Sequence, residues 1–245
     1  MIKEEYYSQK QVTDSYETLR FKSYGGEYVN GRELEDVFRE IDGLPQDANI
    51  LDSPIGTGRL SKKLIKHGLS NLFGIDTSME MLRYSRNQCG TKITLKQESA
   101  FKTTFPDKYF KAIFSLRFFF HFNDIDLLIK EYSRLLEPDG MIIFDTIRWS
   151  PRAHFSRLQK KHGGVIYIHS DRKVENLLKK NGLVVRSHRR FFIIPSLLYA
   201  YLNKPLITLL DTLEKILPDV ICCKSIWIIA KENKEENKEE NKDVP

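Results

Sequence analysis

Asp52, Gly56 and Gly58 lie close together in the stretch NILDSPIGTGRL, Asn49 to Leu60, where a short apolar run ends in an acid and two glycines follow. This order is typical of a buried strand, a tight turn and the start of a helix, where the backbone can approach a nucleotide-like ligand. A second acid, Asp76, ends the next apolar run, 18 residues after Gly58. A carboxylate there can accept hydrogen bonds from both hydroxyl groups of a ribose. The spacing therefore predicts a site for an adenosine-bearing ligand.

The charge of Asp52 separates two classes of adenosine ligand. A dinucleotide site has the pattern G-x-G-x-x-G/A, and Ser61 occupies the third position of that pattern here. A carboxylate also repels a pyrophosphate, whereas it attracts the ammonium and sulfonium groups of S-adenosylmethionine. The stretch GTGRLSKK lacks the spacing of a P-loop. S-adenosylmethionine is therefore the favoured ligand, and an NAD(P)-dependent reductase is the weaker alternative.

Further motifs follow in order up to Asp145: LFGIDTSMEML, ESAFKTTFPDKYFKAIFS, FFFHFND and RLLEPDGMIIFD. Together with ILDSPIGTGRL they make the chain resemble the class I S-adenosylmethionine-dependent methyltransferases, in particular the small-molecule, UbiE-like (type 11) branch. A weaker likeness continues through HSDRKVENLLKKNGLVV. The resemblance implies an α/β, Rossmann-like sandwich with a seven-stranded, mostly parallel sheet, an antiparallel last strand and helices on both faces. It also implies in-line transfer of a methyl group from S-adenosylmethionine.

The resemblance also places cofactor-binding residues on this chain. It assigns the loop after Asp52 to the methionine moiety, Asp76 to the ribose and Met81 to the neighbourhood of the adenine. Ser99 replaces an acid that usually meets the adenine amino group, and its hydroxyl can still accept that hydrogen bond. The expected cofactor-binding residues are Tyr16, Arg20, Asp52, Pro54, Gly56, Gly58, Asp76, Thr77, Met81, Ser99, Ala100 and Leu116.

Pro54 is a departure from the family, which usually has a glycine at that position. Proline fixes φ near about −65° and favours an extended residue before it. Both effects suit a strand that ends beside it, and the Pro54 carbonyl can still accept a hydrogen bond from the cofactor's ammonium group. We therefore expect a stiffened loop that keeps its function.

One position is a candidate for catalysis, and two N-terminal positions are candidates for covering the cofactor. His121, in FFFHFND, follows the fourth predicted strand and is the candidate general base, although a histidine that only packs or caps a helix is the competing interpretation. Tyr16 and Arg20 resemble an N-terminal segment that covers the cofactor, and Arg20 could pair with its carboxylate. Thr77 and Glu80 form a T-x-x-E capping box that would begin the next helix. No metal-ligand spacing occurs, so no metal is expected.

Short β-rich runs alternate with helical patterns along the chain, which predicts βαβ units around a parallel sheet. The predicted strands are 49–52, 71–76, 92–96, 111–116, 141–147, 183–194 and 225–230, and the predicted helices are 59–67, 79–87, 124–136 and 171–181. We expect an N-terminal helical cap over residues 1–47 and one methyltransferase domain over 48–230. Segments 148–169 and 195–224 should lie on the substrate side, the second as a helical insertion. Residues 231–245 repeat Lys, Glu and Asn and should form a charged, solvated tail.

The amino-acid composition bears on the cellular compartment of the protein and on the kind of methyl acceptor that it suits. The tail holds four Lys against five Glu and one Asp, so the net charge of +6 leaves about +8 on the body. Only three Cys occur and the N-terminus has no apolar signal segment, which favours a cytoplasmic protein. Segment 148–169 is basic, with no acid, and residues 195–223 are apolar. Together they suit a small-molecule or lipid-like, amphiphilic acceptor with an anionic group, and a peripheral contact with a membrane surface.

Other functions remain open from the sequence alone. Basic segments also bind RNA, so RNA methylation is an alternative, although no RNA-binding motif makes a nucleic-acid partner the expectation. A protein that keeps the methyltransferase fold without catalysis is another. The identity of the acceptor, the methylated atom and the oligomeric state cannot be predicted from these residues.

Overall fold

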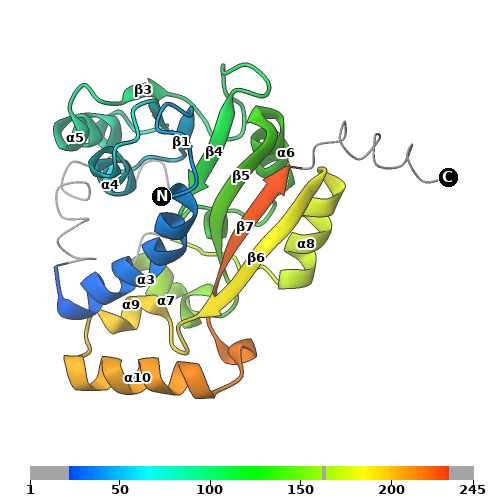
Figure 1. The fold of residues 1–245 in the computed structure, drawn as a ribbon. Helices are drawn as coiled ribbons and strands as arrows, with labels where there is room; N and C mark the ends of the chain where they lie inside the picture. Colours follow the sequence, from blue (N-terminus) through cyan, green and yellow to red (C-terminus); the bar gives the residue numbers. More distant parts are fainter. Residues whose placement is uncertain (1–21, 162–163, 232–245) are drawn as a thin grey trace.

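The computed structural model of the protein describes residues 22–161 and 164–231. The predictions for Tyr16, Arg20, the first part of the cap and nearly all of the charged tail lie outside these residues. Within them, seven strands form one sheet in the order β3-β2-β1-β4-β5-β7-β6 (Figure 1). The strands are β1 (Ile50–Asp52), β2 (Leu72–Asp76), β3 (Thr94–Gln97), β4 (Phe110–Ser115), β5 (Leu136–Ile147), β6 (Leu183–Phe191) and β7 (Lys224–Lys231).

The sheet is mostly parallel. Strands β1 to β5 pair in parallel, whereas β7 is antiparallel to both of its neighbours, β5 and β6. The predicted fold class, with an antiparallel last strand, is therefore confirmed. The strand order reverses between β1 and β4, and in such sheets ligands bind at the carboxyl ends of the strands beside the reversal.

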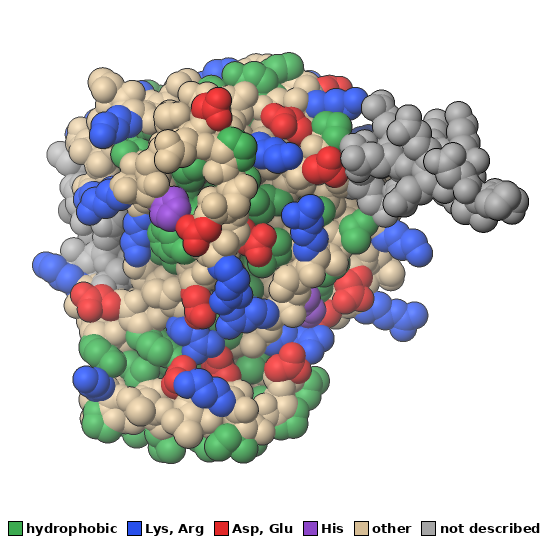
Figure 2. All heavy atoms as spheres, in the orientation of Figure 1, with side chains coloured by type: hydrophobic (Ala, Val, Ile, Leu, Met, Phe, Trp, Pro, Cys, Tyr) green, Lys and Arg blue, Asp and Glu red, His purple; other side chains and the backbone are tan. Residues whose placement is uncertain are grey.

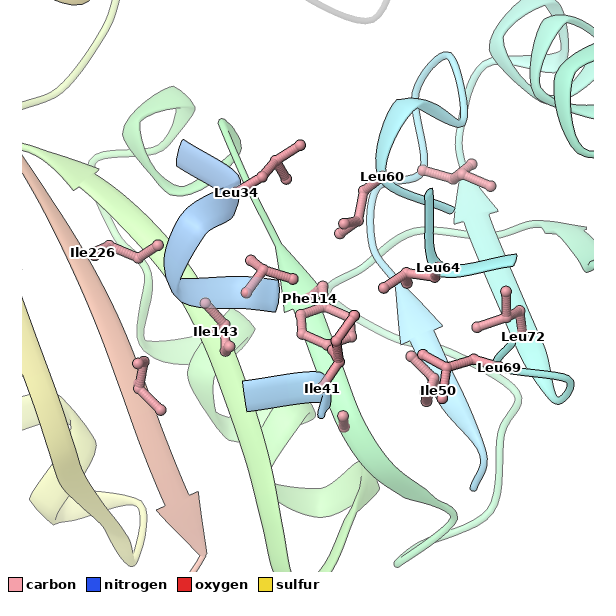
Figure 3. Packing of buried hydrophobic residues seen from close by; sticks show 14 of the residues in the cluster. Leu34, Ile41, Ile50, Leu60, Leu64, Leu69, Leu72, Phe114, Ile143 and Ile226 are labelled. Atoms are coloured by element: carbon pink, nitrogen blue, oxygen red, sulfur yellow. The ribbon is translucent and has the colours of Figure 1, made fainter. Parts of the chain in front are cut away.

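Helices cover both faces of the sheet, as two apolar clusters show. On one face, Leu34 of helix α3 and Leu64 of helix α4 pack with Phe114 of β4 (Figure 3). On the other face, Leu128 of helix α6 packs with Ile113 of β4. The helices around the sheet are α3 (Tyr24–Ile41), α4 (Arg59–His67), α5 (Met79–Cys89), α6 (Asp126–Leu135) and α8 (Asp171–Lys180). The inner strands are apolar almost throughout because neither face meets water.

The start of β5 is where the predicted and observed elements differ most. The sequence predicts a helix up to Leu136 and a strand from Met141, but the structure begins β5 at Leu136 itself. Residues 138–140, Pro-Asp-Gly, indicate a turn, yet they lie within the strand. The pairing with β4 shifts register between Phe110 and Ala112, and Asp139 has a φ of 57°. A bulge of this kind lets a strand absorb turn-like residues without ending.

Segment 195–224 packs against α3. It forms α9 (Ser196–Tyr199), α10 (Lys204–Ile216) and the short helix η3 (Asp219–Ile221), so its expected helical character is observed. The ring of Tyr199 stacks on that of Tyr28 in α3, with centroids 5.7 Å apart. Arg32 of α3 pairs with Asp211 at 2.8 Å and with Glu214 at 2.6 Å. The division into cap, domain and tail stays a prediction.

The outer side of α10 exposes apolar side chains to solvent. Leu209 and Ile216 are 54% and 74% exposed, and hydrophobic spheres gather over this helix in Figure 2. None of the described helices is both long enough and apolar enough to cross a bilayer. The expected peripheral membrane contact stays a prediction.

The contact between α3 and α9 makes a testable prediction at Gly25. A Cβ atom there would lie 1.7 Å from the backbone carbonyl oxygen of Tyr199, so Gly25→Ala must push α9 away. We expect the free energy of unfolding, measured in urea, to fall by about 2 kcal/mol or more. Gly31→Ala in the same helix is the control: its Cβ meets nothing within 4 Å. That variant should gain about 0.5–1 kcal/mol from helix propensity. Equal effects at the two glycines would contradict this packing.

Candidate active site

A cavity of about 540 Å³ opens at the carboxyl ends of β1, β2 and β4. Because these strands run in parallel, the residues that follow each of them meet at one edge of the sheet. The residues predicted from the sequence that line it are Asp52, Pro54, Gly56, Asp76, Thr77, Met81, Ser99, Ala100, Leu116 and His121. The structure thus brings together nearly all of the predicted site residues that it describes.

The two glycines of the first loop have different tasks. Gly56 lines the cavity, has a φ of 53° and donates its backbone N–H to the Asp76 carboxylate at 3.0 Å. Gly58 does not line the cavity. Its φ is 77°, and a Cβ there would lie 3.0 Å from that of Ser85 and 3.1 Å from the Cys89 sulfur, both on α5. Gly58 therefore allows α4 to start close against α5. The sequence motif alone does not distinguish this packing requirement from a role in ligand binding.

Asp52, at the end of β1, is buried. The hydroxyl group of Ser61, in the first turn of α4, donates to its carboxylate at 2.7 Å. Burial raises the pKa of Asp52 from 3.8 to about 7, although the Ser61 hydrogen bond and the charge of Arg59 act in the opposite direction. The proximity of Asp76 adds to the rise. Removing a carboxylate from water is unfavourable to its ionised form unless a cation or further donors approach it.

Asp76, at the end of β2, connects two loops of the site. One carboxylate oxygen accepts the Gly56 N–H at 3.0 Å and the other accepts the Ser78 N–H at 2.9 Å. Burial raises its pKa to about 6, and these backbone hydrogen bonds limit the rise. Each carboxylate oxygen can still accept another hydrogen bond, so the acid can hold the loops and a ligand at the same time.

Helix α5 begins one residue later than the capping box predicts. Its N-cap is Ser78, whose hydroxyl accepts the Met81 N–H at 3.3 Å, and the helix starts at Met79. Glu80 pairs with Arg83 at 2.8 Å. The predicted T-x-x-E box with Thr77 as the cap is therefore wrong, because the serine that follows it takes the capping geometry. Thr77 is left exposed at the cavity, with Met81 buried beside it.

The loop after β3 also reaches the cavity. Ser99 is exposed there, and its hydroxyl accepts the Phe101 N–H at 3.4 Å, while Ala100 is buried. Glu98 lines the cavity as well, although strand alternation predicts that it points away. Its carboxylate accepts hydrogen bonds from Thr104, which fold the loop back on itself.

Aromatic side chains form the wall of the cavity beyond β4. The rings of Phe101 and Phe118 both contact that of Phe122 edge-on, with centroids 4.7 Å and 4.9 Å apart. His121 ends the short helix η1 (Phe119–His121) and lines the cavity beside these rings. The segment that follows β5 closes the same side, since Tyr167 lines the cavity and donates its N–H to the Phe120 carbonyl at 2.8 Å.

Several contacts that shape the site have no signal in the sequence motifs. The hydroxyl of Tyr132, on α6, donates to the Ser53 carbonyl at 2.9 Å and so fixes the end of β1 from the opposite face of the sheet. Ser61 is a mismatch to the dinucleotide pattern in the sequence, yet its hydroxyl donates a hydrogen bond to Asp52. Within residues 22–161 and 164–231, no group of three or more His, Cys, Asp or Glu is placed to hold a metal ion.

Comparison with known proteins matches this site to one family. The family model described as "Methyltransferase domain" matches residues 51–144, which run from β1 into β5. An uncharacterised methyltransferase of Geobacillus sp. strain WCH70 is 28% identical over 154 residues, covering 60% of this chain and 70% of its own length. Among solved structures, an S-adenosylmethionine-dependent methyltransferase from Mesorhizobium loti has a TM-score of 0.63 at 19% identity, covering 83% of this chain and 100% of that one.

A second solved structure, with bound ligands, has the same fold. It is geranyl diphosphate C-methyltransferase from Streptomyces coelicolor A3(2), in complex with Mg²⁺, geranyl diphosphate and S-adenosyl-L-homocysteine. Its TM-score is 0.63 at 14% identity, covering 83% of this chain and 79% of that one. Residues 51–144 therefore match a methyltransferase domain, and the chain has the fold of class I S-adenosylmethionine-dependent methyltransferases. S-adenosylmethionine is accordingly the cofactor of this methyltransferase.

The residues present in the methyltransferase cavity fit that cofactor. Two buried carboxylates, Asp52 and Asp76, have raised pKa values because burial outweighs the hydrogen bonds and charges that favour their ionised forms. A ligand with an ammonium group, a sulfonium group and ribose hydroxyls supplies both a cation and donors. A pyrophosphate would instead add negative charge beside two acids.

The burial of Asp52 makes a prediction about stability and pH. Its pKa is 3.8 when exposed and about 7 in the fold, so the folded cofactor-free protein holds the proton more tightly than the unfolded chain does. With respect to this group, stability is therefore greatest below the unfolded pKa of 3.8, falls as the pH rises from there to about 7, and levels off above that pH. From pH 4 to pH 8, the wild type should lose on the order of 3 kcal/mol more than Asp52→Asn, measured by urea unfolding at each pH. Parallel profiles for the two proteins would contradict an ionisable Asp52 that is poorly solvated.

Proposed function

We propose that this methyltransferase transfers the methyl group of S-adenosylmethionine, in line, to a small amphiphilic acceptor. The observation that carries the proposal is that one continuous cavity joins two chemically different walls. At one end it presents the acids Asp52 and Asp76, and at the other it presents the rings of Phe101, Phe118 and Phe122. The acidic end suits the cofactor, and the aromatic end suits an apolar acceptor.

The acidic end of the cavity would hold the cofactor by charge and hydrogen bonding. Asp52 would accept from the ammonium group, and its carboxylate would then be ionised and compensated. Asp76 would accept from the ribose hydroxyls through the lone pairs that Gly56 and Ser78 leave available. Met81 would pack against the adenine. When bound, the cofactor supplies a methyl group that is already electrophilic, so the main task of the protein is to position the acceptor.

The aromatic end of the cavity would receive the acceptor. Phe101, Phe118 and Phe122 pack edge-on and leave an apolar surface, and Val165 and Tyr167 approach from segment 148–169. Burying an acceptor against these side chains also excludes water from the transferred methyl group. The Streptomyces neighbour, whose acceptor is geranyl diphosphate, supports an acceptor that combines an apolar body with a polar group.

His121 would act as the general base for acceptors that must lose a proton. It lies at the aromatic end of the cavity, where the acceptor atom would meet the methyl group. Its ring contacts that of Phe120, with centroids 4.6 Å apart. Removing a positioned base typically lowers a rate by about 10²–10⁴-fold.

The test is to follow a tritiated methyl group from S-adenosylmethionine into a bacterial extract. We expect label in the solvent-extractable small-molecule and lipid fraction, with transfer reduced about 10²-fold in His121→Gln while S-adenosylhomocysteine binding is kept. Label found in RNA would replace the proposal by the RNA alternative. Cofactor binding without transfer to any fraction would favour the non-catalytic alternative. A His121→Gln variant with unchanged transfer would remove the base from the mechanism.

A further inference from the structure

We infer that this methyltransferase has a separate subsite for the anionic headgroup of its acceptor, a carboxylate or a single phosphate; the inference rests on the proposed function. The subsite is a second cavity of about 60 Å³ that lies beside the large one. It is built from β7 and from the two predicted substrate-side segments. The lining residues that matter here are Arg117, His121, Trp149, Arg152, Ser196 and Lys224.

The lining of this side pocket carries positive charge. Arg117, Arg152 and Lys224 contribute three cations, and none of the described lining residues is acidic. Two acids that do not line the pocket, Glu33 and Asp145, pair with these cations. Lys224 pairs with both Glu33 and Asp145, and Arg117 pairs with Glu33 at 2.8 Å. The Arg152 guanidinium donates to the Gly164 carbonyl at 2.8 Å and 3.1 Å. The described side chains that line the pocket are therefore cationic or neutral, which favours an anion.

The buried acids hold the lining cations in position. Glu33, on α3, is 1% exposed; burial alone would raise its pKa, but the charges of Arg117 and Lys224 keep it well below its ordinary value. Arg117 has a φ of 61°, which is unusual for a residue with a side chain. Its backbone N–H donates to the Asp145 carboxylate at 2.7 Å, which fixes this conformation. A strained residue that is held this firmly at a cavity is a common feature of functional sites.

The size of the side pocket selects the group that it can take. A volume of about 60 Å³ corresponds to a few water molecules, so it admits a carboxylate or one phosphate but not a whole acceptor. The pocket shares Arg117 and His121 with the large cavity. One molecule can therefore place its apolar body against the aromatic wall and its headgroup among the cations.

A charge placed at the mouth of the pocket tests this subsite. Ser196, the first residue of α9, lines the side pocket but not the large cavity. Ser196→Asp introduces a carboxylate, and Ser196→Asn is the neutral variant of nearly the same size. The probes are octanoate, octyl phosphate and octanol, which differ in the headgroup, titrated by calorimetry into the full chain loaded with S-adenosylhomocysteine.

We expect the wild type to bind octanoate and octyl phosphate at least tenfold more tightly than octanol. Ser196→Asp should bind both anions at least tenfold more weakly than Ser196→Asn does, with octanol affinities alike. Equal affinity of the wild type for the three probes, or equal anion affinity of the two variants, would overturn the subsite while leaving the proposed function intact. Absence of S-adenosylhomocysteine binding in the wild type would instead count against the proposed function itself.

Discussion

The burial of a carboxylate at the end of β1 is the constraint on which the site depends. Asp52 lies at the carboxyl-terminal edge of the sheet and accepts a hydrogen bond from the Ser61 hydroxyl, and the charge of Asp76 acts on it. Two desolvated acids at one edge are unfavourable in the cofactor-free protein. They become favourable when a cation and hydroxyl donors enter, so the burial of these acids selects the charge of the ligand.

The rest of the fold keeps that edge in place. The Tyr132 hydroxyl, on the opposite face of the sheet, donates to the backbone at the end of β1. The Asp76 carboxylate accepts hydrogen bonds from the loop after β1 and from the N-cap of α5. On the far side of the cavity, Glu33 connects α3 to Arg117 and Lys224, so the helix that covers the sheet also organises the cations beside the acceptor end.

Much of this arrangement could be predicted from the sequence, because it depends on local order along the chain. A strand, two glycines, a helix and an acid after the next strand define the cofactor end, and apolar runs of strand length define the sheet. Contacts between distant residues could not be predicted: Glu33 meets Arg117 across 84 positions and Lys224 across 191. Local sequence signals also gave wrong predictions at two places. Thr77 and Ser78 can both cap α5, and Ser78 does so. The turn-like residues around Asp139 lie within β5, at a bulge.

The most direct measurement of the central claim is calorimetric titration of the full chain with S-adenosylhomocysteine and, separately, with NADH, from pH 5.5 to pH 8.5. We expect binding of S-adenosylhomocysteine that strengthens as the pH rises to about 7 and then levels off, because the ammonium group favours ionised Asp52, and no binding of NADH. Binding of NADH, or S-adenosylhomocysteine affinity that falls as Asp52 ionises, would contradict it.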